Sequence, residues 1–368
     1  MMGIPHASDR EARVASDLCI GHDRLRSFIA GIFAAAGSSP EEARIVSDHL
    51  VDANLTGHDS HGLIRAAKYV DWIRDGQLLP NRHAAVVKDT PALLVVDGGF
   101  GYGQVIAREA MELAAERARQ FGLCTVAIRN AGHLGRIGAW PEQLAQAGFA
   151  SIHFVNTSGF GILVAPYGGS DRRLSANPIA AGAPRPGRAP LILDIATSTI
   201  AEGKIQVARN RGEKLKPGVV VDGGGRPTTD PAAFYAQPPG AILPFGGHKG
   251  SGLSLFCEIL AGSLTGGRSS HPDNSTAARL VNNMLSLAFD PAAFPDNSFD
   301  EDVTRLAEWT KASPPLEPAG EVLLPGEVEE RTAEERRRTG VPLDAETVRQ
   351  LVETAASLGV AIPPELRS

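Results

Sequence analysis

Apolar side chains recur at helical spacing through most of the first eighty residues. The pattern predicts helices near residues 23–37 and 40–56, and a third helix from about 66 to 73. The second helix also has a start signal, since Ser39 can cap it, Pro40 suits the first helical position and Glu42 stands at the third. Residues 1–22 lack this pattern and are expected to form a loose polar segment. The first part of the chain is therefore predicted to be a mainly helical layer.

From about residue 84 the pattern changes to short apolar runs typical of strands, at 86–87, 93–96, 124–128, 150–155 and 191–193. Helices are predicted near 104–120, 138–147 and 200–209, and the segment 245–252 opens a further helix that runs to about 265. The two kinds of element do not alternate with strict β-α-β regularity, so we expect an α/β fold with a mixed sheet covered by helices. Further helices are predicted near 299–312, 329–339 and 344–358. We expect residues 299–368 to pack back on 1–82, with 83–298 as the mixed α/β domain.

Composition narrows the class of protein. Hydrophobic residues are 43% and charged residues 21%, as in an ordinary globular domain. The net charge of −6 argues against a nucleic-acid or anionic-membrane partner. Three scattered cysteines suit a reducing compartment, and neither a signal peptide nor an apolar run of roughly 20 residues is visible. We therefore expect a cytoplasmic protein.

The glycine-rich stretches do not match the common nucleotide-binding motifs. Gly99, Gly101 and Gly103 have the spacing G-x-G-x-G instead of G-x-G-x-x-G, and no acidic residue follows about 20 positions later at a strand end. The segment around His248 and Lys249 lacks the spacing and the hydroxyl of a Walker motif. The sequence therefore argues against a Rossmann domain and against a P-loop.

The segment 57–65, G-H-D-S-H-G-L-I-R, concentrates chemically active side chains. His61 and Ser60 are candidate catalytic residues, and Arg65 is of the type that grips a carboxylate with two hydrogen bonds. The alternative interpretation is a solvated turn in which Ser60 caps the next helix. A metal site using His58, Asp59 and His61 is a further possibility, but no acidic residue stands at general-base spacing, and we assign no metal ion.

Two later positions carry similar chemistry. His133 follows a predicted strand between Gly132 and Gly135, where a histidine can meet a substrate and titrate near neutral pH. Asp194 closes an apolar strand, and a carboxylate there needs a partner, either a histidine that it orients or an arginine in a structural pair. His248 and Lys249 begin a predicted helix, whose positive end suits a pyrophosphate or carboxylate. Each of these residues also has a purely structural interpretation.

Taken together, the motifs resemble those of the malate/L-lactate dehydrogenase type-2 family of NAD(P)-dependent oxidoreductases. The resemblance spans essentially the whole chain. It is carried by D-S-H-G (59–62), H-L-G-R-I-G (133–138), A-N-P (176–178), L-D-I-A-T-S (193–198), H-K-G (248–250) and L-P-G-E (324–327). It implies a non-Rossmann dinucleotide-binding domain with a mixed sheet, a helical domain built from both chain ends, and a homodimer.

The resemblance also implies an activity. A hydride would pass between C4 of the nicotinamide and C2 of a small 2-hydroxy/2-oxo acid, with Arg65 holding the carboxylate and a histidine moving the proton. His61 oriented by Asp194 is favoured as the acid/base, and His133 remains the alternative. The candidate cofactor-binding residues, with Lys249 added from the helix-start argument, are His61, Gly135, Arg136, Ile137, Ile192, Leu193, Asp194, Ile195, Ala196, His248, Lys249, Asn282, Gly326, Glu327, Val328 and Glu329.

Two other functions stay open at this point. One is a metal-dependent hydrolase or lyase that uses His58, His61 and Asp194. The other is a cofactor-binding protein without turnover. The sequence does not name the acid, nor does it decide between NAD, which we expect, and NADP.

Overall fold

The described chain divides into two compact units. The computed structural model describes residues 18–274, 279–295, 298–317 and 320–367. One unit comprises the described residues of Met1–Asn81 and Glu327–Ser368, and the other comprises those of Arg82–Gly326. The described residues of 299–326, which the sequence groups with the C-terminal helices, are part of the second unit.

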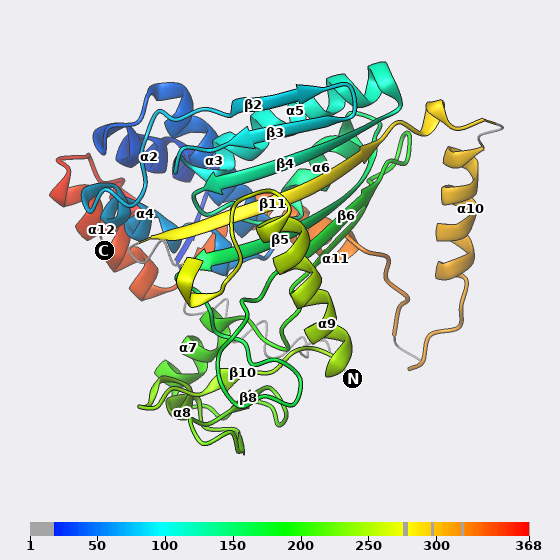
Figure 1. The fold of residues 1–368 in the computed structure, drawn as a ribbon. Coiled ribbons are helices and arrows are strands. Elements are labelled where there is room, and N and C mark those ends of the chain that lie inside the picture. The colour runs from blue at the N-terminus through cyan, green and yellow to red at the C-terminus, as the bar shows by residue number, and fades with distance from the viewer. Residues whose placement is uncertain (1–17, 275–278, 296–297, 318–319, 368) are drawn as a thin grey trace. The chain divides into compact units, whose positions relative to one another are not determined.

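A seven-stranded sheet is the centre of the described part of the second unit, in the order β2-β3-β4-β11-β5-β6-β7 (Figure 1). Within that described sheet, only β3 and β4 pair in parallel. The expected mixed sheet is therefore confirmed. Its strands are β2 (Ala85–Thr90), β3 (Leu93–Asp97), β4 (Leu123–Ala131), β5 (Ala150–Gly159), β6 (Ile179–Ala183), β7 (Leu191–Ile195) and β11 (Leu280–Phe289).

Helices cover both faces of this sheet. On one face lie α5 (Gly103–Phe121) and α6 (Ala139–Gln146), and the core between them and the strands includes Trp140. On the other face lies α9 (His248–Cys257), which runs on as one π-helical stretch, η2 (Glu258–Ser263), against β5 and β11 (Figure 1). The helix predicted to open in 245–252 and run to about 265 thus exists, but its second half is wound more loosely than an α-helix.

A small lobe of the second unit has its own core, centred on Val164, Ile205 and Phe234. The remaining elements of this unit include the exposed helix α10. They are α7 (Glu202–Arg211), β8 (Val220–Val221), β9 (Pro227–Thr228), α8 (Pro231–Tyr235), β10 (Ala241–Ile242), η3 (Pro272–Asn274), η4 (Pro291–Ala293) and α10 (Phe299–Lys311).

The first unit joins the two ends of the described chain. Its helix α3 starts as predicted, because Ser39 Oγ accepts a hydrogen bond from the Glu42 N–H at 3.2 Å and Pro40 follows the cap. Its elements are β1 (Leu18–Ile20), α2 (His22–Ala35), α3 (Pro40–Leu55), η1 (Asp59–His61), α4 (Arg65–Arg74), α11 (Glu327–Thr339), β12 (Val341–Leu343), α12 (Ala345–Ser357) and η5 (Pro364–Leu366). The expectation of a loose segment is wrong for 18–20, which pair with 341–343 as an antiparallel strand, while 1–17 lie outside the described residues.

The hydrophobic pattern does not indicate β6 or the central strand β11. The reason for β11 is visible in its sequence, since Asn282 and Asn283 are of a type depleted in strands. Across the described residues we find no helix with the length and apolar character that a bilayer crossing requires.

Candidate functional site

The D-S-H-G segment forms a short 3-10 turn, η1, between α3 and α4. Ser60 Oγ lies 3.0 Å from His61 Nδ1. Arg65, the first residue of α4, donates from Nε to the Ser60 carbonyl oxygen over 2.7 Å. Serine, histidine and arginine, the three residue types expected to act on a substrate, are therefore linked directly in the first unit.

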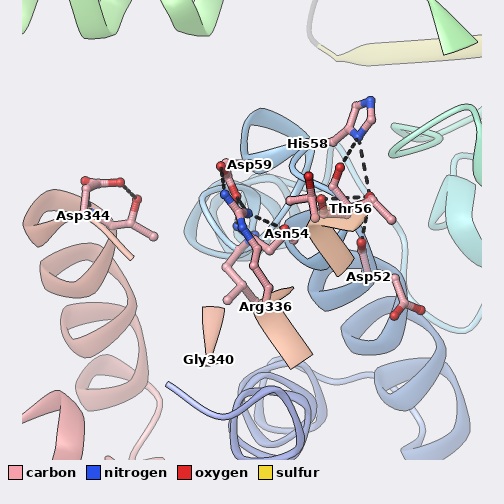
Figure 2. A network of polar contacts seen from close by, with 12 residues as sticks. Asp52, Asn54, Thr56, His58, Asp59, Arg336, Gly340 and Asp344 are labelled. Carbon is pink, nitrogen blue, oxygen red and sulfur yellow. Dashed lines mark hydrogen bonds and ion pairs between the residues drawn. The ribbon is translucent and has the colours of Figure 1, made fainter. Parts of the chain in front are cut away.

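A second set of contacts holds this turn against α3 and α11 (Figure 2). The Asp59 carboxylate accepts hydrogen bonds from Arg336 Nη1 at 2.6 Å and from Asn54 Nδ2 at 2.7 Å. Asn54 Oδ1 also accepts the Leu63 N–H at 2.7 Å. A side chain at Gly62 would collide with the Asn54 amide, so the turn can pass this close only as glycine. The sequence does not single out Asn54 or Arg336.

His133 belongs to the second unit, in the loop between β4 and α6, and is half-buried. The next residue, Leu134, donates its N–H to Asn282 Oδ1 at 3.0 Å. The Asn130 N–H is bound in the same way by Asn283 Oδ1 at 3.0 Å. Both asparagines lie on β11, so the central strand fixes the loop that carries His133.

Asn282 itself is buried, and its amide nitrogen bonds within the protein to Thr157 Oγ1 at 2.9 Å and to the Asn156 carbonyl at 3.3 Å. Asn282, which the resemblance places among the cofactor-binding residues, therefore also shapes the His133 loop.

Asp194, at the end of β7, meets the start of α6. Its Oδ2 accepts the Gly138 N–H at 2.7 Å, and a methyl group at Gly138 would lie 2.8 Å from that oxygen. Arg136 is buried and forms an ion pair with Glu142. Segments 135–138 and 192–196, which the resemblance places in one site, are therefore neighbours in the second unit. Within this grouping Ile137 is part of the hydrophobic core.

The L-P-G turn lies along the same edge of the sheet. Ile192 donates its N–H to the Pro325 carbonyl at 3.1 Å. Gly326, with a φ of +96°, lies against the Ile192 backbone, where a Cβ would come within 3.3 Å of the nitrogen. Leu193, Ile195 and Ala196 continue this edge. The other predicted residues of the turn, Glu327, Val328 and Glu329, begin α11 in the first unit.

The start of α9 offers a second group of donors. Gly246 and Gly247 both have positive φ values, +56° and +61°, which bring the chain into the helix at His248 and Lys249. Both side chains are exposed, and the His248 ring meets Tyr167 edge-on with ring centroids 5.9 Å apart. The positive helix end and the hydrogen-bonding nitrogens of these two side chains fit a phosphate-bearing ligand.

A buried carboxylate lies on the opposite face of the sheet from α5 and α6. Glu258 accepts hydrogen bonds from Asn177 Nδ2 at 2.7 Å, Asn156 Nδ2 at 3.0 Å and the Ser270 N–H at 2.8 Å. Asn156 Oδ1 in turn accepts from Asn283 Nδ2 at 2.9 Å. The A-N-P motif therefore supplies, through Asn177, part of a polar network that continues to the asparagine holding the His133 loop.

Three further titratable groups in the interior of the second unit are suited to structural roles. Burial raises the pKa of the Cys257 thiol to about 12 and that of Cys124 to about 11, so both remain protonated at neutral pH. Burial lowers the pKa of His153 to about 3. Nowhere in the described residues do three or more His, Cys, Asp or Glu side chains form a group that could hold a metal ion.

Comparisons with known proteins agree on one family. A family model described as malate/L-lactate dehydrogenase matches residues 20–352. Hydroxycarboxylate dehydrogenase B of Escherichia coli strain K12 is 43% identical over 338 residues, which cover 91% of this chain and 93% of that protein. L-lactate dehydrogenase of Cupriavidus necator is 36% identical over 342 residues, covering 92% and 97%.

The structure of sulfolactate dehydrogenase from Methanocaldococcus jannaschii superimposes with a TM-score of 0.84 at 36% identity, covering 93% of this chain and 98% of that one. These relatives are dehydrogenases and give no support to the hydrolase or lyase alternative. Because the family model and the relatives each span nearly the whole sequence, the chain belongs to the malate/L-lactate dehydrogenase family.

Proposed function

We propose that the protein is an NAD(P)-dependent oxidoreductase that transfers a hydride between the cofactor and C2 of a small 2-hydroxy/2-oxo carboxylic acid. Its relatives are named for L-lactate, L-sulfolactate and malate, which are all 2-hydroxy acids. The observation that carries the proposal is the η1 turn, where Ser60, His61 and Arg65 are hydrogen-bonded into one group. A proton donor beside a carboxylate-binding cation is what reduction of a 2-oxo acid requires of the protein.

The residues of the second unit fit a dinucleotide. The glycine turn at the start of α9 suits its pyrophosphate, with His248 and Lys249 as donors. The edge formed by Ile192–Ala196 and Gly326, with Gly135 and Arg136 nearby, would hold the remainder. When bound, the nicotinamide supplies or accepts the hydride at C4. The sheet order, with a single parallel pair among the described strands, supports a dinucleotide domain unlike the parallel Rossmann type.

In the proposed reaction the Arg65 guanidinium binds the substrate carboxylate. Its Nε–H is tied to the Ser60 carbonyl, which orients the terminal nitrogens that carry its other donors. His61 gives a proton to the 2-oxygen during reduction and removes it during oxidation, and His133 is the second candidate for this step. We assign to Asp194 the orientation of the acid/base, since a carboxylate held by the Gly138 N–H can accept further hydrogen bonds.

A cytoplasmic location and a homodimer are part of the proposal. The dimer is supported by an apolar face of α9 and η2 in which Leu255, Phe256 and Ile259 are all exposed, together with Leu264 just beyond. Exposed apolar patches of this kind mark protein interfaces. Sedimentation of the purified protein would distinguish a dimer from a monomer.

The proposed function is tested by the loss of reduced-nicotinamide absorbance. Purified protein would be mixed with NADH or NADPH and with pyruvate, oxaloacetate, phenylpyruvate, hydroxyphenylpyruvate or glyoxylate. Oxidation with any of these acids gives the reaction class, the preferred cofactor and the substrate branch. No oxidation across the panel, with or without divalent metal, would refute the proposed chemistry.

A further inference from the structure

Arg336 lies on α11, far along the chain from the η1 turn, yet contacts it directly (Figure 2). Its guanidinium is bidentate on Asp59, with Nη1 at 2.6 Å from Oδ1 and Nη2 at 3.2 Å from Oδ2. Nη1 also donates to the Asn54 carbonyl oxygen at the end of α3. The arginine therefore joins α11, α3 and the residue two positions before His61.

We propose that Arg336 is a positioning residue for His61, acting through Asp59 and Asn54. This inference rests on the proposed function, in which His61 touches the substrate. The three residues, named here the turn clamp, fix both ends of η1. Asp59 is its first residue, and Asn54 binds the Leu63 N–H just beyond it.

The clamp is rigid because each member has more than one partner. Asp59 Oδ1 accepts from both Arg336 and Asn54, and the Asn54 side chain is almost wholly buried. The Arg336 side chain is only 17% exposed although its partner Asp59 is 52% exposed. Bidentate arginine–carboxylate pairs of this kind add geometric specificity as well as energy.

The helix that carries Arg336 is itself anchored. Gly340 ends α11 with a φ of +94°, donates its N–H to the Arg336 carbonyl at 2.9 Å and lies against the Ile20 backbone. The chain then enters β12, which pairs with β1. Arg336 is thus held by backbone structure on its own side, so its contacts determine where the turn lies.

The charge of Arg336 matters as well as its shape. Asp59 is two residues from His61, and Arg336 offsets its negative charge. Other charged or titratable groups of the first unit near the turn are His58 on the turn, Arg65 on α4 and Asp52 on α3. Loss of Arg336 would leave Asp59 uncompensated and raise the pKa of the acid/base, whereas loss of the Asp59 charge would lower it. If Arg336 only stabilised the fold, the two substitutions would not shift the pKa of the acid/base in opposite directions.

The test compares Arg336→Met, Arg336→Lys and Asp59→Asn with a matched control, Arg26→Met. Arg26 also bridges two acids of the first unit, Asp48 at 2.8 Å and Asp52 at 2.6 Å, and its side chain is 26% exposed. We expect Arg336→Met to lower kcat by about 10- to 100-fold, because a misplacement of about 1 Å in a reacting group has costs of this order. The kcat of Arg336→Lys should lie between those of the wild type and Arg336→Met. The kcat of Arg26→Met should stay within about 3-fold of the wild type.

The pH profile of kcat/KM should move to higher pH in Arg336→Met and to lower pH in Asp59→Asn. Hydrogen exchange supplies a readout that does not need activity: the amides of 61–63 should exchange faster in Arg336→Met than in Arg26→Met. If the wild type turns over no 2-oxo acid, the proposed function fails, but hydrogen exchange still shows whether Arg336 holds the η1 turn in place. Equal exchange at 61–63 in Arg336→Met and Arg26→Met, or equal losses of kcat in these two variants, would overturn the inference. If Arg336→Met does not fold, Arg336→Lys and Asp59→Asn decide it.

Discussion

Lowering the pH should weaken the second unit through His153. This residue lies on β5, is fully buried, and has Ser286 Oγ at 2.8 Å from Nδ1 and Ser151 Oγ at 3.0 Å from Nε2. Burial lowers the pKa of its imidazole from 6.5 to about 3, because the protonated ring would lose its hydration. Since the unfolded chain has no such penalty, the two states differ in the protons that they bind.

The sign and size of the effect follow from this difference. Between about pH 3 and 6.5 the unfolded chain binds a proton at His153 that the folded protein does not, so the free energy of unfolding falls as the pH falls. At pH 5 the loss from this one group is about 2 kcal/mol. That value is nearly the same for any folded pKa between about 2 and 4, because the ring is then neutral in the folded protein at pH 5. Above about pH 7 the full stability is present.

The assay compares urea unfolding of the wild type and His153→Gln at pH 7.5 and 5.0. Glutamine keeps a hydrogen-bonding amide but does not titrate, and the other histidines are common to both proteins. Trp72→Phe and Trp309→Phe in both backgrounds would leave Trp140, in the core of the second unit, as the fluorescent reporter. The wild type should lose about 2 kcal/mol more than the variant on going to pH 5. Equal losses of unfolding free energy in the two proteins would refute the reasoning. His153 would then be a group that can titrate near neutral pH in the folded protein.

Three further predictions concern turnover. His61→Ala should lower kcat by at least about 100-fold in the 2-oxo acid assay, and near-normal kcat would move the acid/base role to His133. Asp194→Asn keeps an oxygen for the Gly138 N–H, so kcat should fall by at least about 10-fold with little change in cofactor affinity by fluorescence titration, and an unchanged kcat would make the residue structural. Asn282→Ala leaves the Leu134 N–H unpaired, so the free energy of unfolding should fall by about 1–3 kcal/mol and kcat should fall as well. Wild-type values of both quantities would contradict this prediction.

The sequence predicts those parts of the fold whose causes are local. The start of α3 depends on neighbouring residues, and Ser39 and Pro40 mark it in both sequence and structure. β11 could not be predicted because asparagine is unfavourable in strands and the strand contains two in succession. Their presence is explained only by the loop amides and the side-chain network that these asparagines bind. β1 is too short to carry a periodic pattern, and its partner lies more than 300 residues away.

The candidate site shows the same limit. The motif residues His61, His133 and Asp194 could be proposed because their chemistry and their settings are visible in the sequence. Glycines flank the two histidines, and Asp194 closes an apolar run. Arg336 could not, since it opens a run of three arginines on a charged helix and nothing local distinguishes it from its exposed neighbours. Its role depends on where α11 lies against α3, and that arrangement is decided by packing in three dimensions.

The pairing of β1 with β12 has a consequence for synthesis on the ribosome. The first unit needs 18–20 and 341–343 together, but the roughly 250 residues of the second unit are made between them. At about 5–20 residues per second, the N-terminal helices wait roughly 12–50 s for the strand that completes them. During that interval the second unit can fold first, while the face of α3 that α11 later covers remains a candidate for a chaperone.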